Sequence, residues 1–250
     1  MNRKMSGAPV IAVTIILSVL GFFLRRSQLN TVFDAIGVIP GSKMPLVWVA
    51  LAAVLLFAVL SFLLRGRKKY QALSSTRILP MAGGVAAGLL MLVSGLIIGL
   101  SSTRTTTDLL IGLGSILTGL CWAGTSVLRH KGTRIHPVLF LVPVAFFIVE
   151  LVCRFRFWTR DPVILDYCFD LFALIASMCA MLHLSSYCFD QGSRRATVFF
   201  AYCGIFFSAV AMAGAPMSEL LGYLAVALWL MVQLWLLLRP MPRKRRGEEE

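Results

Sequence analysis

Long apolar segments alternate with short polar ones along almost the whole chain. Eight apolar runs stand out, at residues 8–24, 46–64, 79–100, 109–128, 138–152, 163–184, 197–215 and 220–238. Most of them reach the roughly 20 residues that an α-helix needs to cross a hydrocarbon core about 30 Å thick. The fifth run is short and contains Pro143, so residues 153–158 are expected to extend it into the interface. The pattern predicts an all-α integral membrane protein, a bundle of eight transmembrane helices.

Composition supports this interpretation because charged residues are scarce. The chain has 250 residues, of which 58% are hydrophobic and 14% are charged, and its mean hydropathy is +0.84. Soluble proteins are about one-quarter charged. The apolar runs leave no room for a soluble domain between them. We therefore expect a single polytopic transmembrane domain over residues 1–238, followed by a disordered, charged cytoplasmic tail over residues 239–250.

Positive charge is unevenly distributed among the connecting segments. The formal net charge is +13, a value that in a soluble protein would suggest nucleic acid as the partner. When the connections are assigned alternately to two sides of a membrane, most Lys and Arg fall on the side that holds both chain ends. The positive-inside rule then places both termini in the cytoplasm, with Arg25 and Arg26 as exceptions. The expected partners are the lipid bilayer and anionic headgroups at the basic loops, and not nucleic acid.

Small residues recur at helical spacing on the third and fourth runs. Each run carries them along one face, since residues three, four or seven positions apart are neighbours on a helix. The expected helix-packing residues are Gly84, Gly88, Gly95 and Gly99 on one run, and Gly112, Ser115 and Gly119 on the other. In water each mid-helix glycine would cost about 1 kcal/mol relative to alanine. In lipid, small faces let two backbones pack closely, so we expect a tight transmembrane hairpin.

The sixth run holds two acidic residues that share one helix face. Asp166 and Asp170 are four residues apart, and Ser177 continues the same face. If the helix begins near Pro162, Asp170 lies about 12 Å from its outer end. Two carboxyl groups at that depth would titrate as a pair and share a proton, as a proton-coupled carrier requires. The alternatives are an interfacial Asp166 with Asp170 hydrogen-bonded to a neighbouring helix, and a divalent metal holding a diphosphate, which no second acidic motif supports.

A second polar pair lies on roughly the opposite face of the same run. Cys179 and His183 are also four residues apart. A metal or cofactor site there would need further ligands from other runs, and none stands out, so a hydrogen-bonded interior histidine is the simpler interpretation. The six cysteines are scattered without a CxxC motif, which argues against a zinc site and a disulfide framework. Neither a metal nor a cofactor is expected.

Three further polar residues fall within or beside the later runs. Glu150 precedes Arg154 by four residues, which is the spacing of an intrahelical ion pair. Glu219 opens the eighth run, where the positive end of the helix dipole favours a carboxylate.

The sequence contains no motif of a known membrane enzyme. It has no HExxH, no GxSxG, no Walker lysine motif and no intramembrane aspartyl GxGD motif. The leading hypothesis is therefore a non-catalytic structural or interaction component of a bacterial inner membrane, which would have a membrane-protein partner. The first alternative is a transporter of a small solute or lipid, proton-coupled through Asp166 and Asp170. The second alternative is a membrane-embedded enzyme.

Overall fold

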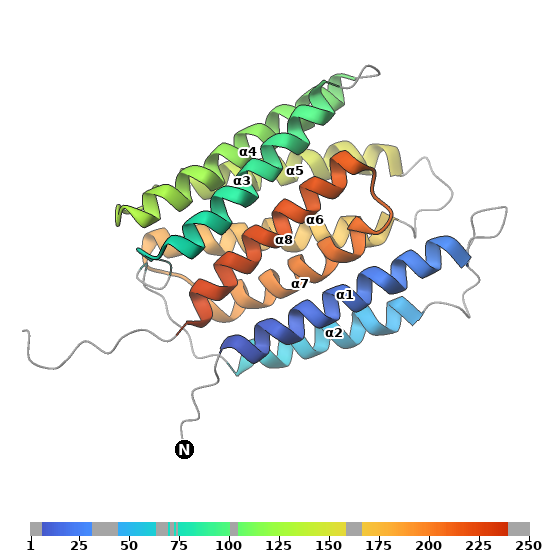
Figure 1. The fold of residues 1–250 in the computed structure, drawn as a ribbon, viewed down its shortest axis with the longest axis horizontal. Helices are drawn as coiled ribbons and strands as arrows, with labels where there is room; N and C mark the ends of the chain where they lie inside the picture. Colours follow the sequence, from blue (N-terminus) through green and yellow to red (C-terminus); the bar gives the residue numbers. More distant parts are fainter. Residues whose placement is uncertain are drawn as a thin grey trace, which may run out of the picture.

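The computed structural model describes residues 7–31, 45–63, 70, 73, 75–100, 105–158 and 167–239. Within them lie eight α-helices (Figure 1): α1 (Gly7–Thr31), α2 (Pro45–Phe62), α3 (Ile78–Gly99), α4 (Thr106–His130), α5 (Val138–Trp158), α6 (Cys168–Ser185), α7 (Arg194–Met212) and α8 (Met217–Leu238). A 3₁₀ turn, η4 (Ser186–Phe189), follows α6. All eight helices are long and apolar enough to cross a membrane. The predicted class of eight-helix membrane protein is therefore confirmed.

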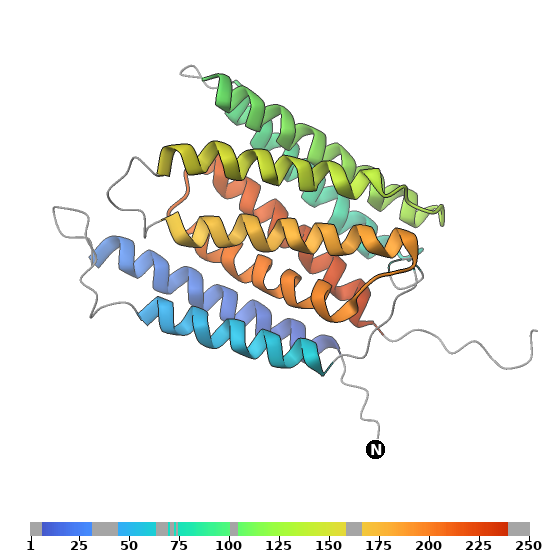
Figure 2. The same ribbon diagram turned by 180° about the vertical axis from the view of Figure 1, so that it is seen from behind.

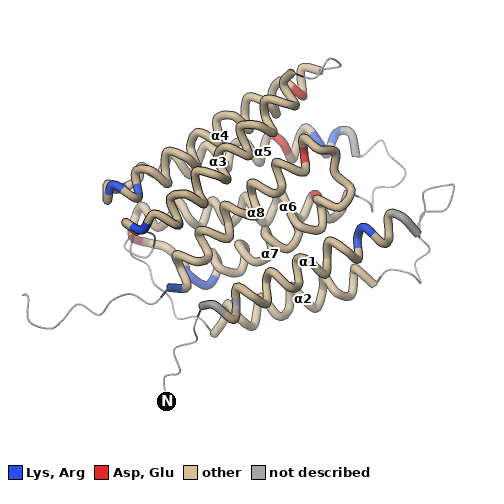
Figure 3. Tube along the Cα trace, viewed as in Figure 1, with Lys and Arg blue, Asp and Glu red and all other residues tan. Residues whose placement is uncertain are grey.

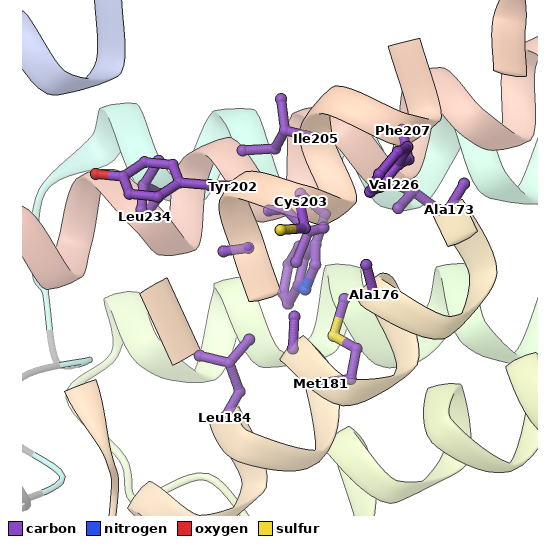
Figure 4. Packing of buried hydrophobic residues seen from close by; sticks show 14 of the residues in the cluster. Ala173, Ala176, Met181, Leu184, Tyr202, Cys203, Ile205, Phe207, Val226 and Leu234 are labelled. Carbon is purple, nitrogen blue, oxygen red and sulfur yellow. The ribbon is translucent and has the colours of Figure 1, made fainter. Parts of the chain in front are cut away.

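Successive helices run in opposite directions, so α1 begins at the end of the bundle where α8 ends (Figures 1 and 2). The hairpin of α3 and α4 lies along one side, and α1 and α2 lie along the other, with α6, α7 and α8 between them. The core centres on α7, in which every residue from 201 to 211 is buried. Figure 4 shows buried residues of this core, with Cys203 on α7 and Ala176 and Met181 on α6.

A very close backbone contact joins α3 to α4. A Cβ atom placed on Gly88 would lie 2.7 Å from the carbonyl oxygen of Gly119, and one on Gly119 would lie 2.6 Å from that of Gly88. Gly95 and Gly112 are related in the same reciprocal way, at 2.7 and 2.9 Å. Any side chain at these four positions would force the two helices apart, because the obstructing atoms belong to the backbone.

The other small residues on these two helices make different contacts. A Cβ on Gly84 would meet the side chain of Ser126, while Ser115 and Ser126 are buried and donate hydrogen bonds to carbonyl groups of their own helix. Gly99 differs, since no atom lies within 4 Å of the Cβ that it lacks. Its backbone is nevertheless close to Gly112, whose added Cβ would lie 3.1 Å from the Gly99 nitrogen.

Two helix ends differ from those that the apolar runs predict. Helix α1 continues for two turns beyond residue 24, through Arg25, because that side chain is only 6% exposed and its guanidinium lies 5.4 Å from the centre of the Phe169 ring. Helix α5 extends to Trp158, as expected. The expectation that α6 begins near Pro162 is wrong, because its first residue is Cys168.

Some of the predictions fall outside the described residues. Asp166 is one of them, as is the tail beyond Arg239.

The contact between α3 and α4 predicts that Gly119→Ala destabilises the protein and Gly124→Ala does not. The methyl group at Gly119 meets backbone atoms, whereas nothing lies within 4 Å of the corresponding position at Gly124 on the same helix. We expect Gly119→Ala to lower the free energy of unfolding by about 1–3 kcal/mol. Thermal unfolding in detergent micelles measures both variants, and equal melting temperatures would contradict the packing described here.

Candidate functional site

Charged residues of the described part lie at the two ends of the bundle, with an apolar zone between them (Figure 3). The end where α1 begins, here called the basic end, carries Arg77, Arg129, Lys131, Arg134, Asp190, Arg194, Arg195 and Arg239. The opposite end, here called the mixed end, carries Arg25, Arg26, Asp108, Glu150, Arg154, Arg156, Asp170 and Glu219. This separation is what a hydrocarbon core requires, because unpaired charges are costly inside it.

An ion triad ties α5 to α8 at the mixed end. The Arg154 guanidinium lies 2.7 Å from a carboxylate oxygen of Glu150 and 2.7 Å from one of Glu219. The side chains of Arg154 and Glu150 are only 13% and 8% exposed. The expected pair within α5 forms, and its arginine also bridges to a second helix. A guanidinium suits this position because its fork of N–H groups donates to two carboxylates at once.

Asp170 belongs to the same polar cluster and links α6 to α8. The hydroxyl of Tyr223 donates a hydrogen bond of 2.9 Å to Oδ1 of Asp170. The Arg154 guanidinium lies 5.9 Å from the centre of the Tyr223 ring. Since α6 begins at Cys168, Asp170 occupies the first turn of its helix. The prediction that it lies about 12 Å inside the helix is wrong, because that prediction placed the start of the helix near Pro162, whereas α6 begins at Cys168.

A polar cavity of about 250 Å³ opens beside this cluster. Its charged lining consists of Arg25, Arg154, Asp170 and Glu219, which come from α1, α5, α6 and α8. The rest of the lining includes the end of α7 and the short link to α8. The cavity therefore lies where helix ends meet, at the level expected for lipid headgroups.

An apolar groove of about 440 Å³ adjoins the polar cavity. It runs between α2 and α6 and is floored by α7 and α1, with Phe207 and Cys203 of α7 among its lining residues. Its rim includes Leu51 of α2 and Phe172 of α6, which are 52% and 43% exposed, so the groove opens sideways from the bundle.

Arg25 and Phe169 line both the groove and the polar cavity, so the two spaces meet at these residues. Along α6 the groove extends from Cys168 to Ala176, about 12 Å at 1.5 Å per residue. This length is close to the hydrocarbon depth of one leaflet, roughly half of a 30 Å core.

The other predicted polar residues of α6 lie away from both spaces. Ser177 is buried against α7, with its hydroxyl 3.3 Å from the position of an added Cβ on Gly204. The ring of His183 stacks on Phe200 with the ring centres 5.4 Å apart, and Cys179 is half-buried. In the described part of the chain, no three His, Cys, Asp or Glu residues lie close enough together to hold a metal ion.

Sequence reasoning did not identify two residues of this site. Tyr223 follows Glu219 by four residues on α8, a spacing that places both on one helix face and was a usable signal. Arg25 gave no such signal, because the sequence places it just beyond an apolar run, where a loop is the ordinary interpretation.

A separate polar contact holds the connections together at the basic end. The Arg134 guanidinium donates to a carboxylate oxygen of Asp190 at 2.8 Å, and the other carboxylate oxygen accepts from the backbone N–H of Tyr70 at 2.7 Å. The Tyr70 hydroxyl accepts from the backbone N–H of Ile135 at 3.0 Å, and partial burial raises the pKa of this phenol. These bonds join three connections and support the fold rather than a ligand.

Comparison with protein-family models, with curated proteins and with solved structures finds no significant match to this chain. The fold itself defines the class, which is a multi-pass membrane protein with eight candidate spans.

The ion triad predicts a large difference between two neighbouring arginines of α5. Removing the Arg154 side chain would leave Glu150 buried without its counter-ion, whereas Arg156 is exposed. We expect Arg154→Ala to destabilise the protein by about 3 kcal/mol or more, the usual result of breaking a buried ion pair, and Arg156→Ala to have little effect. Melting temperatures in the same detergent compare the variants, and an equal effect of both would show that the triad does not stabilise the bundle.

Proposed function

We propose that this protein is a non-catalytic, lipid-binding component of a bacterial cytoplasmic membrane. The observation that carries the proposal is the apolar groove between α2 and α6, which opens sideways and continues into a polar cavity at one end. A phospholipid has the matching division into apolar chains and a polar headgroup. Its acyl chains would lie along α6 and α7, and its headgroup would face the residues of the mixed end.

The dimensions and the chemistry of the groove both support a lipid. Ligand pockets of proteins are mostly apolar, with a few polar groups that fix the orientation of the ligand. Here the lining is apolar along about one leaflet depth, and Arg25 and Gln28 stand at one end of it. A lipid entering sideways from the bilayer would not need to leave the hydrocarbon, so binding would carry little cost of desolvation.

A proton-coupled carrier is the second candidate, since Asp170 lies on the wall of the polar cavity. Carriers place their substrate site near the bilayer midplane. The cavity at Asp170 is instead bounded by the first turn of α6 and the first turn of α8, at the end of the bundle. This position favours lipid binding over proton-coupled transport.

The charge difference between the two ends supports a particular orientation. In the described part, the basic end carries seven basic residues and one acidic residue, whereas the mixed end carries four of each. By the positive-inside rule, the basic end, where α1 begins and α8 ends, would face the cytoplasm. The lipid site would then draw on the outer leaflet.

A reporter fused to the carboxyl terminus tests this orientation in bacterial cells. We expect a fluorescent protein, which folds in the cytoplasm, to be bright at that position, and a periplasm-dependent phosphatase to be inactive there. The opposite pattern would reverse the orientation and move the lipid site to the inner leaflet.

Filling the groove tests lipid binding, with two valines of α2 as a matched pair. Val54 lines the groove, whereas Val59 is 58% exposed and lies outside it. Because a tryptophan at Val54 would occupy the volume of an acyl chain, we expect Val54→Trp to lower the phospholipid retained after detergent washing about tenfold, equivalent to about 1.4 kcal/mol. Val59→Trp is expected to retain as much lipid as the wild type.

The measurement is the amount of phospholipid per protein, by mass spectrometry of the purified full-length chain. Equal retention by the two tryptophan variants would mean that the bound lipid only surrounds the protein, and the proposal would be wrong.

A further inference from the structure

We infer that the polar cavity takes the headgroup of a zwitterionic phospholipid that carries a primary amine. The inference rests on the proposed function, since the groove would hold the chains of the same lipid. It adds the class of headgroup, which the apolar groove alone does not specify.

The phosphate is assigned to Arg25. This side chain lines both the groove and the cavity, so it lies at the boundary between chains and headgroup. It is only 6% exposed, and the Phe169 ring beneath its guanidinium fixes its direction. A guanidinium binds phosphate oxygens through paired N–H donors, and the bond is stronger away from bulk water.

The amine is assigned to the carboxylates beyond Arg25. The charged residues that line the cavity are two carboxylates, Asp170 and Glu219, and two arginines, Arg25 and Arg154. Arg154 is shared between Glu219 and the buried Glu150, and Asp170 receives a neutral hydroxyl hydrogen bond from Tyr223. An ammonium beside Asp170 and Glu219 would therefore be stabilised in a low dielectric, while the phosphate of the same headgroup lies on Arg25.

The residues that line the cavity also indicate which kind of cation it would bind. A primary ammonium has three N–H donors, which suit the oxygens of Asp170 and Glu219 on the cavity wall. A trimethylammonium group has no N–H and would add no hydrogen bond to these carboxylates. An anionic headgroup would add negative charge beside them.

The size also fits an ethanolamine phosphate. The cavity has a volume of about 250 Å³, and a water molecule takes up about 30 Å³ in the liquid. The cavity therefore has room for a phosphate group joined to a two-carbon amine.

Headgroup selectivity of the full-length chain tests the inference. Delipidated protein in detergent is titrated with phosphatidylethanolamine, phosphatidylcholine and phosphatidylglycerol of identical chains, and binding is followed by native mass spectrometry. We expect the ethanolamine lipid to bind at least about tenfold more tightly than either of the others, a typical effect of a charge-assisted hydrogen bond. Equal binding of the three lipids would overturn the assignment of the headgroup.

Asp170→Asn is the informative variant, and Asp108→Asn is its control. An asparagine oxygen still accepts the Tyr223 hydrogen bond, so the fold is preserved while the negative charge is removed. Asp108 is also in the first turn of its helix at the mixed end, but it caps α4 and does not line the cavity. We expect Asp170→Asn to reduce the ethanolamine preference to within about threefold, and Asp108→Asn to leave it unchanged. If a folded Asp170→Asn protein keeps the preference for the ethanolamine lipid, the Asp170 carboxylate does not bind the headgroup.

Three outcomes separate this inference from the proposed function. If all three lipids bind equally and Val54→Trp weakens each of them, the groove binds lipid and only the headgroup assignment fails. If Val54→Trp has no effect on any of them, the proposed function fails as well. Glycerophosphoethanolamine, the same headgroup without chains, is expected to compete at least about 100-fold more weakly than the lipid. If glycerophosphoethanolamine competes as well as the lipid, the ligand is a soluble amine phosphate and not a lipid.

Discussion

The bridge from Arg154 to carboxylates of two helices is the interaction on which the arrangement of the mixed end depends. Hydrocarbon supplies no water to solvate a charge, so a charged side chain near the membrane interior must find its partners within the protein. Arg154 does so by bonding Glu150 on its own helix and Glu219 on α8, at 2.7 Å each. The start of α8 is thereby fixed beside α5, and Tyr223, one turn further along α8, reaches Asp170 of α6.

Elsewhere in the described part of the bundle, the helices pack mainly through small and apolar residues. The α3–α4 hairpin is joined by glycine contacts that bring backbone against backbone, and α7 is enclosed by its neighbours. On the opposite side α2 packs on α1 and α7, and the space between it and α6 is the apolar groove. The bundle thus combines one side that is closed by small residues with another that has an open apolar groove.

The sequence was a good guide wherever a feature depended on neighbouring residues. Apolar runs predicted eight membrane-spanning helices, and the spacing of Glu150 and Arg154 predicted their ion pair. It was a poor guide to features set by tertiary contacts. The continuation of α1 through Arg25 depends on Phe169, which lies 144 positions away, and the bond from Arg154 to Glu219 spans 65 positions. The depth of Asp170 was wrong because no local signal marks Cys168 as the first residue of α6.

The measurement that tests the central claim most directly is a map of the contacts that a bound lipid makes. A phospholipid with a photoactivatable group in its acyl chain would be crosslinked to the full-length protein in vesicles, and the labelled peptides identified by mass spectrometry. A lipid held in the groove predicts adducts concentrated on groove-lining residues of α2 and α6, such as Leu51 and Phe172. Adducts spread equally onto outward-facing residues of α4, such as Leu113 and Leu117, which are 60% and 54% exposed, would contradict a specific lipid site.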